Sequence, residues 1–167
     1  MGKAVGIKIE AMKKEDIDQV LVIEHSSFSM PWSKNLFLSE FRSPGVSTLL
    51  VALGDAPVRT VSAFIIYWIV ADEMHILNLA VDPEQRRQGI AKTLVLSALR
   101  RAFEKGAKRA FLEVRASNIP AYKLYLGLGF SGTSVRREYY DMPVEDAIVM
   151  TLETGALASL MRSGACL

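Results

Sequence analysis

The chain is poor in the residues on which disulfide frameworks and metal sites depend. Its 167 residues include one cysteine, Cys166, and two histidines, His25 and His75. One cysteine cannot form an intramolecular disulfide, which is compatible with a reducing compartment. Neither histidine has cysteine or acidic partners at metal-ligand spacing, and Cys166 lacks a histidine and an acid at a catalytic spacing. We therefore expect no disulfide, no metal and no cysteine nucleophile.

Apolar segments of membrane-spanning length are not expected either. The apolar run 63–71 is much shorter than the ~20 residues of a membrane-spanning helix. Its β-branched and aromatic residues instead predict a buried strand. Residues 1–4 lack the apolar core of a signal peptide. These features predict a cytoplasmic protein with no membrane partner.

Charge of one sign is not in excess. Lysine and arginine number 20 against 18 acidic residues, a formal net charge of +2. This balance leaves no large electrostatic footprint for nucleic acid, so no direct nucleic-acid partner is expected. The basic pairs at 86–87, 100–101 and 136–137 are typical of solvated faces. Half of the residues are hydrophobic, which together with the length indicates one folded domain.

Hydrophobic periodicity and turn residues predict the order of elements. Ser33 and Asn118 are predicted helix caps, because their side-chain oxygens can accept free first-turn amides. Gly106 is predicted at a left-handed helix end. The predicted strands are 7–12, 47–53, 58–70, 73–81, 110–115, 130–139 and 146–152, and the predicted helices are 14–28, 33–42, 90–105 and 118–129. The fold class is α/β (α+β), a mixed twisted sheet of six to seven strands with helices on both faces.

The segment between strand 73–81 and helix 90–105 has the character of a phosphate-binding loop. A helix start offers free amide hydrogens and a partial positive charge. Gly89 and Ala91 would let a pyrophosphate approach the backbone, and Arg86 and Arg87 could add charge-assisted contacts. The alternative is an ordinary strand-to-helix turn with exposed arginines. Neither a G-x-G-x-x-G nor a G-x-x-x-x-G-K-[ST] motif occurs in this loop, which disfavours a dinucleotide or P-loop site there.

An ordered set of motifs resembles the GNAT superfamily of acetyltransferases. R-R-Q-G-I-A at 86–91 fits its [RQ]-x-x-G-x-[GA] signature, and L-N-L-A-V-D-P precedes it. The other motifs are similar to the RimI group, the ribosomal-protein-alanine N-acetyltransferases; they are I-E-H-S-S-F-S-M-P-W-S (23–33), L-E-V-R-A-S-N (112–118), A-Y-K-L-Y-L-G-L-G-F (121–130), R-R-E-Y-Y (136–140) and E-D-A-I-V-M (145–150). The resemblance covers residues 7–152.

This resemblance implies the GNAT fold, acetyl-coenzyme A (acetyl-CoA) as acetyl donor, and a set of site residues. Glu113 would accept a proton and Tyr125 would donate one. The implied coenzyme contacts are the backbone of Leu79, Ala80 and Val81, the pyrophosphate loop Arg87, Gln88, Gly89, Ile90, Ala91 and Lys92, and Asn118. Ala91 replaces the second glycine of the common signature. The implied domain is 1–153, and 154–167 form a C-terminal tail beyond the resemblance.

The two implied catalytic residues also have simpler interpretations. Glu113 alternates with apolar Leu112 and Val114, so its carboxylate would project from a buried strand where burial raises its pKa; it could equally be solvated on a sheet face. Tyr125 lies on a core-facing helical stripe, where a packed aromatic is the simpler interpretation. A buried phenol nevertheless seeks a hydrogen-bond partner, and a departing thiolate is one.

The acceptor is expected to be a protein N-terminus, the N-terminal alanine of a small-subunit ribosomal protein. Two alternatives remain: an acetyltransferase for a small-molecule amine or lysine side chain, and a non-catalytic module that binds acyl-coenzyme A. Trp32, Tyr139 and Tyr140 could line an acceptor groove or merely pack. In the tail, Leu157, Leu160 and Met161 would share one helical face and dock on this protein or a partner.

Overall fold

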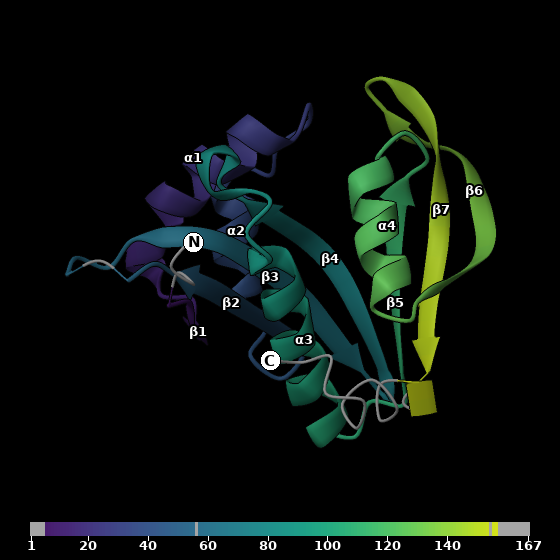
Figure 1. Cartoon of the computed structure of the whole chain (residues 1–167), viewed down its shortest axis with the longest axis horizontal. Coiled ribbons are helices and arrows are strands. Elements are labelled where there is room, and N and C mark those ends of the chain that lie inside the picture. The colour runs from purple at the N-terminus through teal and green to yellow at the C-terminus, as the bar shows by residue number, and fades with distance from the viewer. Residues whose placement is uncertain (1–5, 56, 154, 157–167) are drawn as a thin grey trace. The chain divides into compact units, whose positions relative to one another are not determined.

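The computed structural model describes residues 6–55, 57–153 and 155–156. This part of the chain contains both helices and strands (Figure 1). They are β1 (Lys8–Ala11), the short 3-10 helix η1 (Lys14–Asp16), α1 (Ile17–Ser27), α2 (Lys34–Glu40), β2 (Ser47–Leu53), β3 (Val61–Val70), β4 (Glu73–Val81), the 3-10 helix η2 (Pro83–Gln85), α3 (Ile90–Glu104), β5 (Arg109–Arg115), α4 (Ile119–Gly127), β6 (Ser131–Asp141) and β7 (Val144–Glu153). The strands form a seven-stranded sheet in the order β1-β2-β3-β4-β5-β7-β6.

The chain divides into two compact units. The first is drawn from Met1–Tyr67 and Asn78–Ala98, and the second from Trp68–Leu77 and Leu99–Leu167. The predicted domain 1–153 stays a prediction. The predicted tail face at Leu157, Leu160 and Met161 lies outside the described residues, as does Cys166.

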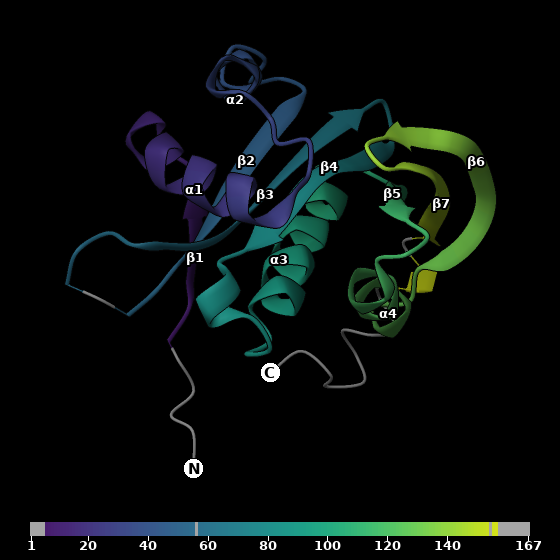
Figure 2. The ribbon, with the colours of Figure 1, turned by 90° about the horizontal axis from the view of Figure 1, so that it is seen from above.

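The first unit has helices on both faces of its strands. Helices α1 and α2 cover one face and the start of α3 covers the other (Figure 2). Residues 61–67 of β3 are buried without alternation, as expected of a strand covered on both sides. Phe37 of α2 contacts Phe64 of β3 edge-on, with ring centroids 5.7 Å apart. α2 is therefore anchored on β3 through aromatic packing.

The second unit is a helix-backed group of strands. β4 pairs in parallel with β5 over Glu73–Ile76 and Arg109–Leu112, confirming the predicted strand–helix–strand unit around α3. β5 pairs antiparallel with β7, and β7 pairs antiparallel with β6. β7 therefore lies between β5 and β6, although β6 follows α4 directly in the chain. A sequence prediction of successive strands does not reveal this insertion.

Local signals set most element boundaries. Ser33 Oγ accepts the amide of Leu36 at 3.2 Å, and Asn118 Oδ1 accepts the amide of Ala121 at 3.2 Å, so both predicted caps are confirmed. Gly106 follows α3 with φ +97°, as predicted. Strands β2 and β4 have the predicted bounds.

Most other predicted boundaries differ from the structure by one or more residues, and the clearest differences are in β3, the first helix and the final hairpin. β3 begins at Val61 rather than 58, because the Thr60 carbonyl closes the preceding turn by accepting the Gly54 amide. Residues 14–16, predicted as the start of a helix, form η1 before α1. The final hairpin is longer than predicted: β6 runs to Asp141 and β7 starts at Val144, with a cis Met142–Pro143 bond in the turn.

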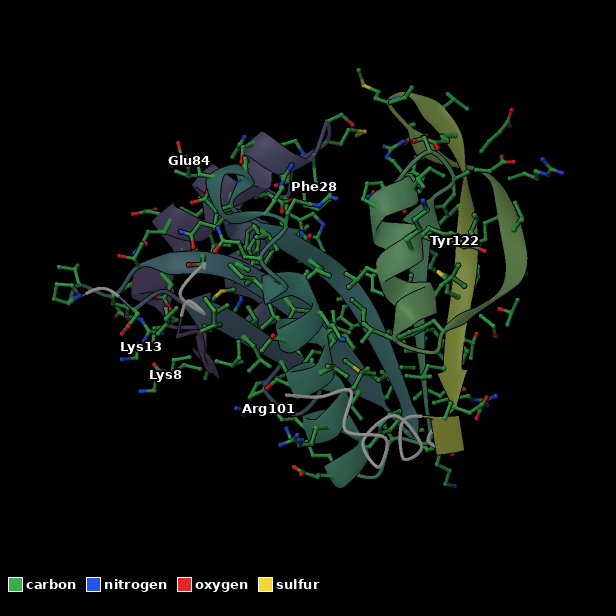
Figure 3. The ribbon with its side chains drawn as sticks, in the orientation of Figure 1. Lys8, Lys13, Phe28, Glu84, Arg101 and Tyr122 are labelled. Carbon is green, nitrogen blue, oxygen red and sulfur yellow. The ribbon has the colours of Figure 1, made fainter. Side chains whose placement is uncertain are left out.

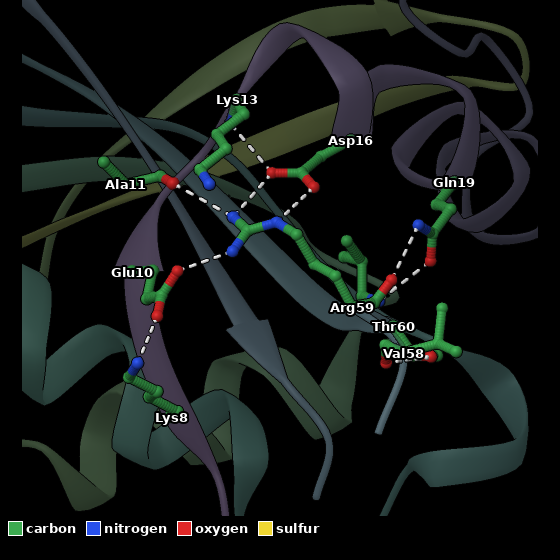
Figure 4. Close-up of polar contacts among 10 residues, drawn as sticks. Lys8, Glu10, Ala11, Lys13, Asp16, Gln19, Val58, Arg59 and Thr60 are labelled. Carbon is green, nitrogen blue, oxygen red and sulfur yellow. Dashed lines mark hydrogen bonds and ion pairs between the residues drawn. The ribbon is translucent and has the colours of Figure 1, made fainter. Parts of the chain in front are cut away.

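An arginine network joins the first strand to the first helices (Figure 4). Arg59 donates from Nε to Asp16 Oδ1 at 2.7 Å and from Nη2 to Asp16 Oδ2 at 2.9 Å. Its Nη1 donates to Glu10, which also pairs with Lys8. Asp16 is buried, so the loop before β3 supplies its charge partner.

None of the described helices is long and apolar enough to cross a membrane. Within the same described ranges, no group of three or more histidine, cysteine or acidic residues is arranged to hold a metal ion.

Candidate functional site

The first group of predicted site residues lies where β4 gives way to α3, a segment we call the coenzyme loop (residues 82–89). Asp82 starts it: its side chain accepts the Glu84 amide at 3.1 Å, and Pro83 follows in the first turn of η2. The first hydrogen bond of α3 runs from the Thr93 amide to the Gly89 carbonyl at 3.0 Å. The amides of Ile90, Ala91 and Lys92 therefore have no acceptor within the helix, which is the ordinary basis of an anion site.

The backbone of the coenzyme loop leaves room for a bound group. Arg87 has φ +65° and Gly89 has φ +78°, two left-handed residues close together. A Cβ at Gly89 would have no heavy atom within 4 Å, so the space beside this residue is open. The side chains of Arg87, Gln88 and Lys92 are exposed. Open space, free helix amides and nearby cations fit a pyrophosphate. The left-handed Arg87 was not expected from the sequence.

Arg86 is held by protein groups. Its Nε donates to the Val81 carbonyl at 3.1 Å, and its Nη2 donates to Ser27 Oγ at 3.0 Å. Val81 ends β4 and Ser27 ends α1. The guanidinium thus bridges two elements of the first unit, a role that the spacing of the motif did not reveal.

The predicted backbone contacts, Leu79, Ala80 and Val81, form the end of β4. Ala80 is buried, and the other two side chains are half-buried. These three residues lie beyond the segment of β4, Glu73–Ile76, that pairs with β5. Their backbone groups on that side are consequently outside the parallel ladder.

A buried polar cluster stands next to these residues in the first unit. Glu24 of α1 is 1% exposed, and its carboxylate accepts the Trp32 amide at 2.7 Å and the Asn78 side-chain amide at 3.0 Å. Burial raises the pKa of Glu24, opposed by these two hydrogen bonds. Asn78 Oδ1 is buried without a hydrogen-bond partner among the described residues. The sequence motifs did not reveal this cluster, because Glu24 and Asn78 are far apart in the chain.

Trp32 packs as well as being held through its amide. The centroid of its ring lies 5.5 Å from that of Phe37, so Trp32 packs at least in part, as one of the two interpretations expected. Its side chain stays half-buried.

Glu113, in the second unit, is only partly enclosed. It lies on β5 opposite Val149 of β7, and its side chain is 26% exposed. Its Oε1 lies 3.3 Å from Arg136 Nη2. The Tyr140 hydroxyl donates to the Glu113 carbonyl at 3.4 Å. The expectation of a buried carboxylate is therefore met in part, with an arginine from β6 beside it.

Tyr125 lies inside the second unit. It is 6% exposed, and its ring meets that of Phe130 edge-on at 5.6 Å. Burial raises the pKa of Tyr125 above its usual value, and Tyr140 raises it further. The phenol is therefore protonated throughout the neutral range.

Asn118 and its neighbours connect β5 to the final hairpin. The Asn118 side-chain oxygen is engaged as the α4 cap. The Ser117 amide donates to Glu145 of β7, and Arg115 donates to the Met142 and Pro143 carbonyls at 3.2 Å. Sequence analysis did not identify Arg115 or Glu145, because their partners are distant in the chain.

The positions of Tyr139 and Tyr140 in the final hairpin depend on an irregularity in β6. The register with β7 shifts between Arg136 and Tyr140, where Glu138 has φ +48° and donates its amide to Asp146. Such a bulge redirects the following side chains. The Arg115 guanidinium lies 4.0 Å from the centroid of the Tyr140 ring. Burial, followed by Tyr139, raises the pKa of Tyr140 to about 12. Tyr139 itself is 46% exposed.

Comparison with known proteins defines the class. Residues 17–130 match the model of the acetyltransferase (GNAT) family. The chain belongs to this family and is an N-acetyltransferase, as the sequence motifs predicted.

Individual relatives show which group of acetyltransferases the chain resembles. The chain is 34% identical over 146 residues to the [ribosomal protein bS18]-alanine N-acetyltransferase of Escherichia coli K12, covering 86% of this chain and 95% of that protein. It is 39% identical over 142 residues to a Bacillus subtilis protein named as a candidate for the same activity, covering 85% and 92%. The crystal structure of the E. coli ribosomal-protein-S18-alanine N-acetyltransferase superposes with a TM-score of 0.79 at 32% identity, covering 88% and 93%. The predicted resemblance to the RimI group is confirmed.

Proposed function

We propose that this enzyme transfers the acetyl group of acetyl-CoA to the α-amino group of a protein N-terminus, the N-terminal alanine of ribosomal protein bS18. The observation that carries the proposal is the 34% identity, over nearly the whole chain, to the E. coli enzyme with that named activity. The proposed setting is the cytoplasm, with residues 1–153 as the catalytic domain, and without membrane or direct nucleic-acid partners.

The coenzyme loop would hold the pyrophosphate of acetyl-CoA. The free amides of Ile90, Ala91 and Lys92, together with the open space at Gly89, support this role. The positive charge of Arg87 and the polar side chain of Gln88 would assist, and Asn118 would contact the coenzyme. Acetyl-CoA supplies an activated acyl group on sulfur. The backbone of Leu79, Ala80 and Val81 would orient that thioester and stabilise negative charge on its carbonyl oxygen.

Glu113 and Tyr125 would carry out the proton transfers of the reaction. Glu113 would accept the proton that the acceptor ammonium loses, leaving a neutral amine to form the new N–C bond as the C–S bond breaks. Tyr125 would donate a hydrogen bond, and finally a proton, to the departing thiolate. The nitrogen loses a second proton as the amide forms, and this proton would restore the phenol directly or through solvent. The raised pKa of Tyr125 keeps the hydroxyl hydrogen in place at neutral pH. Donation to a developing negative charge is then its main contribution, because the phenol is a weaker acid than a free thiol.

An α-amine suits a site with one partly exposed carboxylate as base. Its ordinary pKa of about 7.7–8.0, against about 10.4 for lysine, makes it neutral roughly 300-fold more often at pH 7. Positioning by the residues after the first would supply much of the remaining barrier reduction.

Two peptides of the same sequence test the proposal. One begins with a free alanine, and the other has a blocked N-terminus and a free internal lysine. Acetylation followed by mass spectrometry at equal concentrations should favour the free alanine strongly, and a small or hydroxyl first residue should be tolerated better than a bulky one. Equal acetylation of the blocked peptide, or faster acetylation of spermidine, would replace the proposal with the lysine or small-amine alternative.

A further inference from the structure

Arg86 makes a pair of contacts that join the coenzyme loop to two other elements of the first unit. A guanidinium presents its N–H groups in a rigid plane, so two acceptors on different elements define its orientation. Here the acceptors are the Val81 carbonyl, at 3.1 Å, and Ser27 Oγ, at 3.0 Å. The side chain thus turns back over its own loop instead of extending away from it.

The end of α1 is also tied to β4 at a second point. Glu24, one turn before Ser27, accepts from Asn78 of β4 and from the amide of Trp32. Helix α1 contacts η2, which belongs to the coenzyme loop. Phe28, directly after α1, and Glu84 of η2 lie at the same end of this unit (Figure 3). The segment 28–33 is therefore attached on one side through Glu24 and on the other through Ser27.

The segment 28–33 carries apolar side chains that are incompletely covered. Met30 is 53% exposed, and Phe28, Pro31 and Trp32 are half-buried. Any change in the position of the coenzyme loop would reach this partly exposed apolar segment through the Arg86–Ser27 bond.

We propose that Arg86 is a positioning residue that fixes the coenzyme loop on the end of α1 through Ser27, so that coenzyme binding and the placement of segment 28–33 are coupled. This inference rests on the proposed function of the coenzyme loop. Pre-ordering of the loop lowers the ordering cost of binding, and this favours coenzyme affinity without any contact from Ser27 to the coenzyme.

Arg87 is the residue with which Arg86 can be compared, because both carry the same charge in the same loop. It is adjacent to Arg86 and exposed, and its side chain has no hydrogen-bond or ion-pair partner within residues 6–55, 57–153 and 155–156. If Arg86 acted only as a second phosphate cation, its replacement would resemble that of Arg87. Removing the Ser27 hydroxyl would then have no effect, because that change leaves the charge of the loop intact.

The test measures coenzyme A affinity of the full chain by calorimetry at two salt concentrations. Ser27→Ala should weaken binding about 3- to 10-fold with an unchanged salt dependence, as expected for loss of one solvent-exposed intramolecular hydrogen bond. Ser27→Thr keeps the hydroxyl and should restore most of the affinity. Ser26→Ala is the matched control, because Ser26 Oγ bonds only within its own helix, to the Ile23 carbonyl at 2.9 Å.

A double-mutant cycle and steady-state kinetics test the same positioning role of Arg86. Arg86→Met combined with Ser27→Ala should bind no more weakly than Arg86→Met alone, because both remove the same bond. Arg87→Met should reduce the salt dependence instead. At saturating acetyl-CoA, Ser27→Ala should raise KM for the alanine peptide with kcat little changed. Unchanged affinity in Ser27→Ala, or additive effects in the cycle, would overturn the positioning role of Arg86 but not the proposed function of the coenzyme loop. Absence of coenzyme binding by the wild type would overturn the proposed function as well.

Discussion

Glu24 is an ionisable residue whose side chain is almost completely buried. It is 1% exposed and meets two donors, the Trp32 amide and the Asn78 side chain. A buried carboxylate is costly unless its hydrogen bonds are made, and here they fix the loop after α1 to β4.

Replacing Glu24 separates hydrogen bonding from charge. Glutamine can accept from Trp32 and, after rotation of the Asn78 amide, donate to its free oxygen. We expect Glu24→Gln to match or slightly exceed the wild-type free energy of unfolding at pH 7, whereas Glu24→Ala loses about 2–3 kcal/mol by stranding two donors. Urea denaturation measures both.

The pH dependence of this pair has a defined sign. The folded-state pKa of Glu24 lies above its unfolded value, so the folded wild type binds more protons in that interval. Wild-type stability from this group is present below the unfolded pKa and is lost as pH rises through the folded pKa. The advantage of Glu24→Gln should therefore grow with pH over that interval. A glutamine variant as unstable as the alanine variant at every pH would contradict this account.

Glu113 and Tyr125 differ in how their removal should appear in kinetics. Glu113→Gln and Tyr125→Phe should each lower kcat, by about 10²–10⁴-fold for a general acid–base group, with coenzyme A affinity little changed. Rates at saturating acetyl-CoA, with affinity from calorimetry, measure the two effects separately. Full activity in either variant would assign that proton transfer to water or to another group.

At the scale of elements, the start of α3 depends on a backbone that only a few residue types adopt easily. Gly89 and Arg87 both have positive φ, and β4, η2 and α3 meet within the coenzyme loop. Gly106, at the other end of α3, has φ +97° and likewise has no atom within 4 Å of a Cβ position. The two glycines thus share a left-handed conformation that other residues adopt only at a cost, but they differ in their proposed relation to the coenzyme.

Gly89→Ala and Gly106→Ala should each cost about 1 kcal/mol of stability through the left-handed conformation. Only Gly89→Ala should also weaken coenzyme A binding, and Gly89→Glu should weaken it much further through bulk and like charge. Thermal unfolding and calorimetry on the same samples separate the effects. Equal coenzyme affinity in all three variants would remove the loop from the proposed site.

For the whole molecule, resistance to acid should depend strongly on the Arg59 network. Lys8 and then Arg59 lower the pKa of Glu10 to about 2. Burial opposes ionisation of Asp16, but the hydrogen bonds from Arg59 and the Lys13 amide outweigh it and lower the pKa. Both carboxylates therefore have folded-state pKa values below their unfolded ones. Their contribution is present above about pH 4.3 and is lost as pH falls through the folded values.

Arg59→Met should remove about 1–3 kcal/mol at pH 7, because it leaves the buried Asp16 carboxylate without its guanidinium partner. It should also flatten the decline in stability between pH 5 and pH 3, which urea denaturation at several pH values measures. Lys8→Met is the control: Lys8 is 76% exposed, and an exposed pair contributes little, so this variant should retain nearly all stability. Equal losses in the two variants would refute a special role for Arg59.

The sequence by itself determined the features that depend on neighbours along the chain. Caps at Ser33 and Asn118, the glycine after α3, the bounds of β2 and β4, and the family motifs all follow from short-range hydrogen bonding, periodicity or spacing. The strand–helix–strand unit around α3 was predictable for the same reason, since a parallel pair needs a crossover connection.

Only the tertiary structure decided which distant residues meet. Insertion of β7 between β5 and β6, the Arg136 neighbour of Glu113, the burial of Glu24 against Asn78, and the Arg86–Ser27 bond each join segments far apart in the chain. Periodicity reports which face of an element is apolar, but not which charged group from another element will meet a polar side chain there. Thus Glu24 was indistinguishable from a core position, and Arg86 from a free phosphate ligand, until the fold supplied their partners.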